Sequence, residues 1–234
     1  ESTAVLPDDE RLAQELLTRL CSHDVPTGED LQLADRVGVE LGDAYRPFVL
    51  AAPTLSGQHH AAFAGRLRGQ HILATSEGRR VVGLAHGGVP WRDLGIGSRG
   101  VVAEGPSTER PQLAEGLDDL RAVVEIAVRE GRTGAVAIDD YLPELLLRRS
   151  PRLGARLRAH VYDRLTDRDP ELARTLDTLI AHDFDRGATA AALPVHRNTL
   201  SNRLNRIRSI TGLDVDRAEG RGLVWLAWLE RERT

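Results

Sequence analysis

The chain has 234 residues, of which 41% are hydrophobic and 28% are charged, enough for one large or two modest globular domains. This composition excludes a disordered chain, a collagen and a disulfide-stabilised miniprotein. No apolar run approaches the roughly 20 residues that cross a bilayer, and the N-terminus lacks a signal-peptide pattern. The single cysteine, Cys21, cannot form a disulfide within the chain, which favours a reducing compartment. We therefore expect a soluble, cytoplasmic protein with no membrane partner.

The basic residues are unevenly distributed along the chain. A net charge of −4 by itself argues against nucleic acid, because a nucleic-acid-binding protein must neutralise phosphates. However, residues 187–212 contain four arginines and no Asp or Glu, and the rest of the chain holds 27 basic and 35 acidic residues, a net charge of −8. One acid-free basic segment therefore stands out as a candidate nucleic-acid interface.

The first 141 residues alternate between helical and strand-like patterns. Leucines at helical spacing follow Asp8 and Asp9, either of which can cap a helix, and short apolar runs next to Gly or Pro predict buried strands. The patterns predict helices from 8 or 9 to before Pro26 and over 31–41, a strand over 48–52, a helix over 59–68, a hairpin of strands 72–75 and 80–85, a strand over 100–103, a helix over 111–131 and a strand over 135–138. This order indicates an α+β domain with an antiparallel or mixed sheet and helices on one face.

Everything after Leu142 predicts helix and turn. Helical segments over 145–149 and 153–165 precede four more near the C-terminus. We expect an N-terminal helical lead-in over 1–43, the α+β domain over 44–141, a helical connector over 142–170 and a last domain over 171–234. The sequence begins at Glu1 and contains no methionine, so we also expect an upstream region, which could hold a sensor.

The acid-free segment contains a predicted helix over 196–211, with Gly212 as its C-terminal cap. At 100° per residue, one narrow stripe is apolar and must be buried: Leu200, Leu204, Ile207 and Thr211. The opposite side is polar: Asn198, Asn202, Asn205 and Ser209, flanked by Thr199, Ser201 and Arg206. Asn can bond bidentately to adenine and Arg to guanine, and Arg197 lies in the first turn, where such helices meet base edges. The pattern is typical of a helix that reads the major groove.

The neighbouring segments complete a helix-turn-helix pattern. A helix of small residues over 186–193 ends at Pro194, and a helix over 171–182 precedes it. The alternative is a three-helix packing unit with a solvated polar face, although such faces usually mix both charge signs. Trp225 and Trp228 indicate a final helix that completes the helical core; a dimer interface is the alternative.

The same residues resemble a known family. The segments LPVHRNTL (193–200), RLNRI (203–207) and ITGLD (210–214) closely resemble the C-terminal helix-turn-helix of PucR/CdaR-type bacterial transcriptional regulators. The segments 176–179 and 223–227 match its supporting and closing helices, so the resemblance covers about sixty residues. The family often has Arg-Tyr where this chain has Ser201-Asn202, and Pro194 occupies the turn. The first difference bears on operator preference.

The resemblance also implies a middle domain related to the GGDEF cyclase domain, with a ferredoxin-like arrangement of strands and helices. A working cyclase of that fold needs acidic metal ligands on its first strand and a Gly-Gly-acid-acid hairpin for Mg²⁺ and triphosphate. This chain has Leu-Ala-Ala-Pro over 50–53 and Ser-Glu-Gly over 76–78. We therefore expect a degenerate domain without cyclase activity.

Other candidate sites are weaker. The histidines His59, His60, His71 and His86 have no Cys or carboxylate at ligand spacing, so they do not predict a metal centre. The pair Asp139-Asp140 ends a predicted strand and indicates a solvated turn rather than an acid/base pair. We expect no catalytic residue, no metal and no cofactor, and hence no enzyme.

The sequence therefore predicts a DNA-binding transcriptional regulator with an α+β middle domain and an all-α helix-turn-helix domain. We expect Arg197, Asn198, Ser201, Asn202 and Asn205 to contact base edges, and Thr199, Arg203 and Arg206 to contact phosphates. The expected partners are double-stranded DNA, a second copy or more copies of the chain on paired half-sites, and an unidentified small-molecule effector. Two alternatives are a nucleotide-sensing or enzymatic GGDEF-like protein and a protein-interaction module that does not bind DNA.

Overall fold

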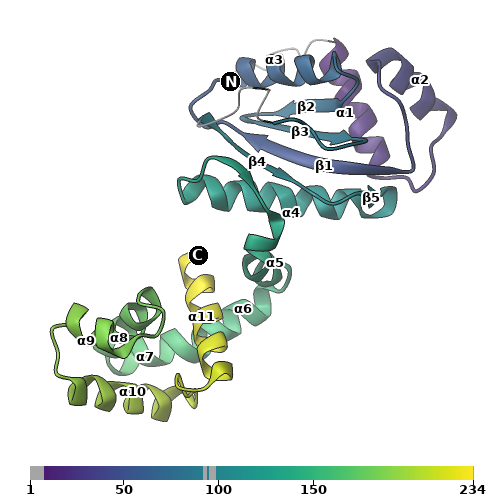
Figure 1. Cartoon of the computed structure of the whole chain (residues 1–234). Coiled ribbons are helices and arrows are strands. Elements are labelled where there is room, and N and C mark those ends of the chain that lie inside the picture. Colours follow the sequence, from purple (N-terminus) through teal and green to yellow (C-terminus); the bar gives the residue numbers. More distant parts are fainter. Residues whose placement is uncertain (1–7, 92–93, 95–98, 234) are drawn as a thin grey trace. The chain divides into compact units, whose positions relative to one another are not determined.

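The computed structural model describes residues 8–91, 94 and 99–233 and consists of two compact units, Glu1–Tyr141 and Leu142–Thr234. The first unit contains a sheet with helices, and the second is helical, as Figure 1 shows. An α+β region followed by a helical region agrees with the prediction. Among the described helices, none is long and apolar enough to cross a membrane.

The sheet of the first unit is mixed. Its order is β2-β3-β1-β4-β6, with β5 paired to β1. Neighbours along this order are antiparallel except β4 and β6, which are parallel. The elements are α1 (Asp8–Leu20), α2 (Gly28–Val37), β1 (Ala44–Ala51), α3 (Gly57–Arg68), β2 (Leu73–Glu77), β3 (Arg80–Ala85), β4 (Val101–Glu104), β5 (Thr108–Glu109), α4 (Arg110–Arg129) and β6 (Gly134–Val136). The predicted order of strand, helix, hairpin, strand, helix and strand is therefore confirmed, with the short β5 added.

Strand β1 is longer than predicted because it continues through Pro47. On one edge, the strand pairs with β4 over residues 48–51 and with β5 over residues 44–45. Pro47 lies between these two ladders, so neither ladder needs a backbone N–H at this position. Its carbonyl oxygen accepts a hydrogen bond from the backbone N–H of Gly105 at 2.8 Å. A central strand can therefore accommodate this proline.

The helices cover both faces of the sheet, so the prediction of helices on one face is wrong. Alternate residues of a strand point to opposite faces. Ala74 of β2 belongs to the cluster that contains Ala64 and Leu67 of α3. Glu77 of β2 points to the other face, where its carboxylate accepts two hydrogen bonds from Arg121 of α4, at 2.7 and 3.0 Å. The apolar runs of the sequence predict buried strands, but they do not specify which helix covers which face.

Helix α2 and the last strand also differ from the prediction in their boundaries. Helix α2 begins three residues before the predicted start, because Thr27 and Asp30 form a capping box. It is ended by Gly38, whose φ of 79° is left-handed. The last strand ends at Val136, and a short 3₁₀ helix follows over Ile138–Tyr141. Asp139 and Asp140 are exposed in that helix, which confirms the solvated-turn interpretation.

A buried ion pair covers the open edge of the sheet at β2. Arg68 donates to the Glu10 carboxylate and to the carbonyl oxygen of Ala74, each at 2.7 Å. The other oxygen of Glu10 accepts from Thr75 Oγ1 and Ser76 Oγ at 3.0 and 2.9 Å, and from the Ser76 N–H. Burial raises the pKa of Glu10, but the hydrogen bonds from Ser76 and Arg68 outweigh it, so the pKa lies below its usual value. The pair satisfies edge groups that would otherwise be free to pair with another chain.

Removing the Glu10 charge tests this interpretation. We expect Glu10→Gln to lower the free energy of unfolding at pH 7 by about 3 kcal/mol, because it leaves Arg68 buried without its partner. Because the folded-state pKa is depressed, the contribution of Glu10 is present above its unfolded pKa and is lost as the pH falls through the folded pKa. The difference between the two proteins in urea unfolding should therefore shrink in acid.

The control for this experiment is Glu15→Gln, which removes an exposed carboxylate from the same helix. That change should alter the unfolding free energy by less than about 0.5 kcal/mol. Equal stability of the Glu10→Gln and Glu15→Gln proteins at pH 7 would contradict the role of the ion pair.

The second unit consists of helices around one apolar cluster. They are α5 (Leu142–Arg149), α6 (Pro151–Arg158), α7 (Arg164–Arg168), α8 (Pro170–Ala181), α9 (Arg186–Ala192), α10 (Arg197–Thr211) and α11 (Ala218–Arg233), with a π-helical turn over Ala159–Asp163. Tyr162 of this turn donates to Asp177 of α8 at 2.9 Å, and Arg231 of α11 forms an ion pair with Asp177 at 3.0 Å. Trp225 and Trp228 pack partly buried against the same cluster, as expected for core residues.

Candidate nucleic-acid interface

Helix α10 is attached to the second unit by its apolar stripe. Leu200, Leu204 and Ile207 are at most 4% exposed and belong to the apolar cluster, together with residues of α8 and α11. Thr211 is also buried. Because the helix repeats every 3.6 residues, burial of this stripe determines which side chains face outward.

Both ends of α10 are held by defined contacts. At the N-terminus, Nδ1 of the capping residue His196 accepts a hydrogen bond from the N–H of Asn198 at 3.2 Å. At the C-terminus, Gly212 adopts a left-handed conformation with φ of 75°, and the ring of His160 bonds to the carbonyl oxygen of Thr211 at 2.8 Å. The helix is thus fixed along its length against the rest of the unit.

A short helix and a tight turn precede α10. Helix α9 is capped by Asp185, whose carboxylate accepts from the N–H of Ala188 at 2.8 Å. After the turn, the N–H of Val195 donates to the carbonyl oxygen of Ala190 at 3.1 Å, and both side chains pack against the apolar cluster. Helices α8, α9 and α10 thus follow the predicted order of supporting helix, short helix, turn and outward-facing helix (Figure 1).

The polar residues predicted to contact DNA are mostly exposed on α10. Those exposed are Arg197, Asn198, Thr199, Asn202, Asn205 and Arg206, and those partly exposed are Ser201 and Arg203. In the helical repeat the three asparagines lie on the side away from the leucine stripe, and Arg197 and Arg203 lie beside the stripe. The eight residues predicted to contact DNA together form the α10 polar face.

Arg203 has partners inside the second unit. Its side chain is 24% exposed, donates to Thr175 Oγ1 at 3.1 Å and lies 3.6 Å from a carboxylate oxygen of Glu171. Thr175 is fully buried and is held in turn by the carbonyl oxygen of Glu171 at 2.7 Å. The guanidinium of Arg203 therefore connects α10 to α8.

Carboxylates outside the basic segment approach two of its other arginines, one from the residue that caps α8 and one from just beyond the end of α10. Arg206 forms an ion pair with Asp169 at 3.1 Å, and Arg208 with Asp214 at 3.0 Å. Arg197 is exposed and forms no ion pair with any residue that the structure describes. The segment lacks acids in sequence, but the fold supplies them, a feature that the charge pattern of the helix alone could not reveal.

These features define a helix-turn-helix unit with a polar outward face, and comparison with known proteins identifies its type. Residues 172–229 match the model of the PucR C-terminal helix-turn-helix domain. This part of the chain is a PucR-type helix-turn-helix domain, so the resemblance seen in the sequence is confirmed.

Two curated relatives are transcriptional regulators by name. The chain is 40% identical over 119 residues to the transcriptional activator PmfR of Paenarthrobacter nicotinovorans, a match covering 48% of this chain and 25% of that protein. It is 44% identical over 68 residues to the carbohydrate diacid regulator of Escherichia coli (strain K12), covering 29% of this chain and 18% of that protein. The matches thus span a quarter or less of each relative.

A solved structure also resembles the chain. It is titled a regulator of polyketide synthase expression from Bifidobacterium adolescentis, with 18% identity and a TM-score of 0.43, covering 97% of this chain and 95% of that chain.

The anchoring of α10 can be tested by stability. We expect Leu204→Ala to lower the free energy of unfolding by about 2–5 kcal/mol, because it leaves a cavity in the apolar cluster. The neighbouring change Asn205→Ala removes an exposed side chain and should alter stability by less than about 0.5 kcal/mol. Urea unfolding followed by circular dichroism measures both, and equal effects would contradict the assigned orientation of the helix.

Proposed function

We propose that the chain is a sequence-specific DNA-binding transcriptional regulator that places α10 in the major groove. The observation that carries this proposal is the α10 polar face, an exposed row of amides and guanidiniums on a helix whose opposite side is buried. The PucR-type domain and the names of the two relatives support it. A regulator of this kind works where the DNA is, in the bacterial cytoplasm.

The residues of the α10 polar face have two proposed roles. Arg197, Asn198, Ser201, Asn202 and Asn205 would contact base edges, and Thr199 and Arg206 would contact phosphates, because Asn and Arg bond bidentately to purines and all these groups can donate to phosphate. Arg203 was assigned to a phosphate from the sequence; its partners on α8 favour a role as a positioning residue that orients α10.

The first unit is proposed to be a degenerate GGDEF-like domain that does not catalyse. The carboxylate of Glu77 at the hairpin is bonded by both Nε and Nη2 of Arg121, so it is engaged within the protein rather than open to a cation. The end of β1 supplies Ala51 and Ala52 where a cyclase needs acidic ligands. Among the described residues, no group of three or more His, Cys, Asp or Glu side chains could hold a metal ion.

Base reading is tested with duplexes selected from a random pool. On the selected sequence, Asn202→Ala should cost about 1–3 kcal/mol of binding free energy, because a base contact is lost. Binding of the same variant to unrelated DNA should not change. The control Gln112→Ala removes an exposed amide from α4 and should leave binding to both duplexes intact, as measured by fluorescence anisotropy at fixed salt.

The outcomes separate the alternatives. Equal weakening on selected and unrelated DNA would reassign Asn202 to the DNA backbone. Failure of the chain to enrich any duplex, together with a salt-insensitive protein complex, would favour the interaction module without DNA binding.

Phosphate contacts are tested by the salt dependence of affinity. Arg206→Gln should weaken binding to all sequences to a similar extent and reduce the slope of log K against log salt by about 1. Asp169→Asn keeps a side chain that can cap α8 and frees Arg206 from its ion pair, so it should strengthen binding to all sequences. An unchanged slope in the Arg206→Gln protein would exclude Arg206 as a phosphate contact.

We also propose that the chain acts as a homodimer or larger homo-oligomer on paired half-sites. Three exposed leucines of α5 and α6 support this: Leu142, Leu146 and Leu153, at 48%, 66% and 66% exposure. Leu142 and Leu146 lie one turn apart on α5, and Leu153 lies on α6, beyond the break in the helix at Ser150. Such side chains favour an interface over water.

Sedimentation equilibrium tests the assembly. Leu146→Glu should shift the chain towards monomer, because a charge would be buried in the interface. The control is Leu31→Glu, which changes a leucine of α2 that is 58% exposed and should leave the mass unchanged. A wild-type chain that is monomeric on its operator would contradict the proposal.

A further inference from the structure

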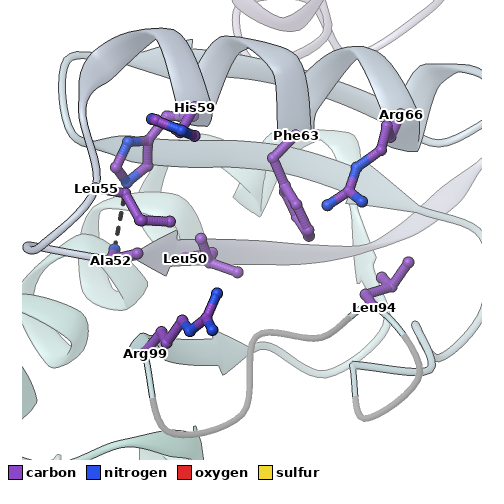
Figure 2. A pocket seen from close by; sticks show the side chains of 9 residues that line it. Leu50, Ala52, Leu55, His59, Phe63, Arg66, Leu94 and Arg99 are labelled. Atoms are coloured by element: carbon purple, nitrogen blue, oxygen red, sulfur yellow. Dashed lines mark hydrogen bonds between the residues drawn. The ribbon is translucent and has the colours of Figure 1, made fainter.

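A cavity lies on the α3 side of the sheet in the first unit, as Figure 2 shows. Its volume is about 170 Å³. The floor and one wall are apolar and come from Leu50 of β1, Leu55 of the loop before α3, and Phe63 of α3. Ala52, His59, His60, Leu94, Arg66 and Arg99 complete the described lining.

Two arginines from different elements reach this cavity. Arg66 extends from α3 and Arg99 precedes β4; in Figure 2 the guanidinium of Arg66 lies beside the Phe63 ring and that of Arg99 extends from below towards Leu50. The guanidinium of Arg66 lies 5.0 Å from the centre of the Phe63 ring. The described lining includes no Asp or Glu. The cavity thus combines positive charge with an apolar wall.

These arginines differ from others of the same unit. Arg19, Arg46, Arg68 and Arg121 each form an ion pair with a carboxylate at 2.7 Å or less. Arg66 and Arg99 form no ion pair with any residue in the described part of the chain. Because both guanidiniums line the same cavity, an anion bound there is attracted by both.

His60 forms part of the wall rather than a ligand contact. Its Nε2 accepts from the N–H of Ala52 at 3.3 Å, so this nitrogen carries no proton, and Nδ1 bonds to the carbonyl oxygen of Ser56 at 2.8 Å. Both ring nitrogens are therefore occupied, and the ring fixes the start of α3 against the end of β1. The anion-binding capacity of the described lining comes from Arg66 and Arg99, with His59 at the edge.

We propose that this cavity binds a small organic acid. Its carboxylate lies between Arg66 and Arg99, whose planar guanidiniums match carboxylate geometry. Its apolar body lies against Leu50, Leu55 and Phe63. The volume is below the roughly 300–1,000 Å³ of pockets for drug-sized ligands, which favours a small acid over a nucleotide. The proposal concerns binding in the first unit and does not depend on DNA recognition by the second.

Isothermal titration calorimetry of the full chain with benzoate tests the proposal. We expect saturable binding with a submillimolar Kd. Arg66→Gln and Arg99→Gln should each weaken it by at least about tenfold, because each removes one charge-assisted contact. The control Arg36→Gln removes an exposed arginine of α2 and should leave the Kd unchanged. Circular dichroism of each variant confirms that it is folded.

Three further probes separate the parts of the proposal. Benzamide has the same shape without the charge and should bind at least tenfold more weakly than benzoate. Inorganic phosphate should also bind more weakly, because it lacks an apolar body. Phosphate or GTP binding as tightly as benzoate would overturn the proposal. So would the absence of benzoate binding up to 10 mM, which corresponds to roughly −3 kcal/mol of binding free energy. A benzoate Kd that neither arginine substitution changes would also overturn it.

Discussion

The second unit depends on burial of the leucine stripe of α10. Once Leu200, Leu204 and Ile207 enter the apolar cluster, the helical repeat leaves no freedom in which residues face water. The contacts at His160, His196 and Gly212 then fix the helix along its axis. Rotation about that axis would move every outward amide, so the apolar core is what fixes the direction of the polar face.

Each of the two units contains a shielded arginine that joins elements distant in sequence, but the two arginines stabilise different features. In the first unit, the Glu10–Arg68 pair satisfies backbone groups at the edge of β2, where an uncovered strand could pair with another chain. In the second, Arg203 connects α10 to the buried Thr175 on α8. In both cases a guanidinium that is mostly shielded joins two elements far apart in sequence. These arginines contribute to the fold, whereas exposed Arg197 remains available to a partner.

The sequence predicted those features that depend on neighbouring residues. The order of strands and helices followed from apolar periodicity, and the orientation of α10 followed from the spacing of its leucines. The boundaries of α2 and β1 were not predicted. The capping box at Thr27 starts α2 earlier than the apolar spacing indicates, and the gap between two ladders at Pro47 lets β1 continue through a residue that usually ends a strand. The placement of α3 and α4 on opposite faces could not be derived from periodicity, which shows that a strand is buried but not by which helix.

For the candidate site, the sequence predicted which side chains are exposed but not which partners they have. The exposed amides were identified correctly as exposed, because exposure follows from the helical wheel. The partners of Arg203 and Arg206 were missed, since Glu171 and Asp169 lie more than one helix away in sequence and only the packing of α8 brings them near. The cavity beside Phe63 had no sequence signal either, because its two arginines lie on separate elements.

The acidic partners of the basic segment have a consequence for specificity. Attraction between guanidiniums and phosphates is independent of sequence and dominates non-specific DNA binding. If α10 binds DNA as proposed, the ion pairs of Arg206 with Asp169 and of Arg208 with Asp214 compete with phosphates for these cations and would weaken that attraction on every duplex alike. The uncharged amides Asn198, Asn202 and Asn205 have no such competitor among the residues that the structure describes, so the proposed contacts to bases would not be weakened. Because specificity is a difference between affinities, internal pairing of the arginines would, in the proposed complex, raise the share of binding energy that depends on sequence while lowering the affinity for DNA as a whole.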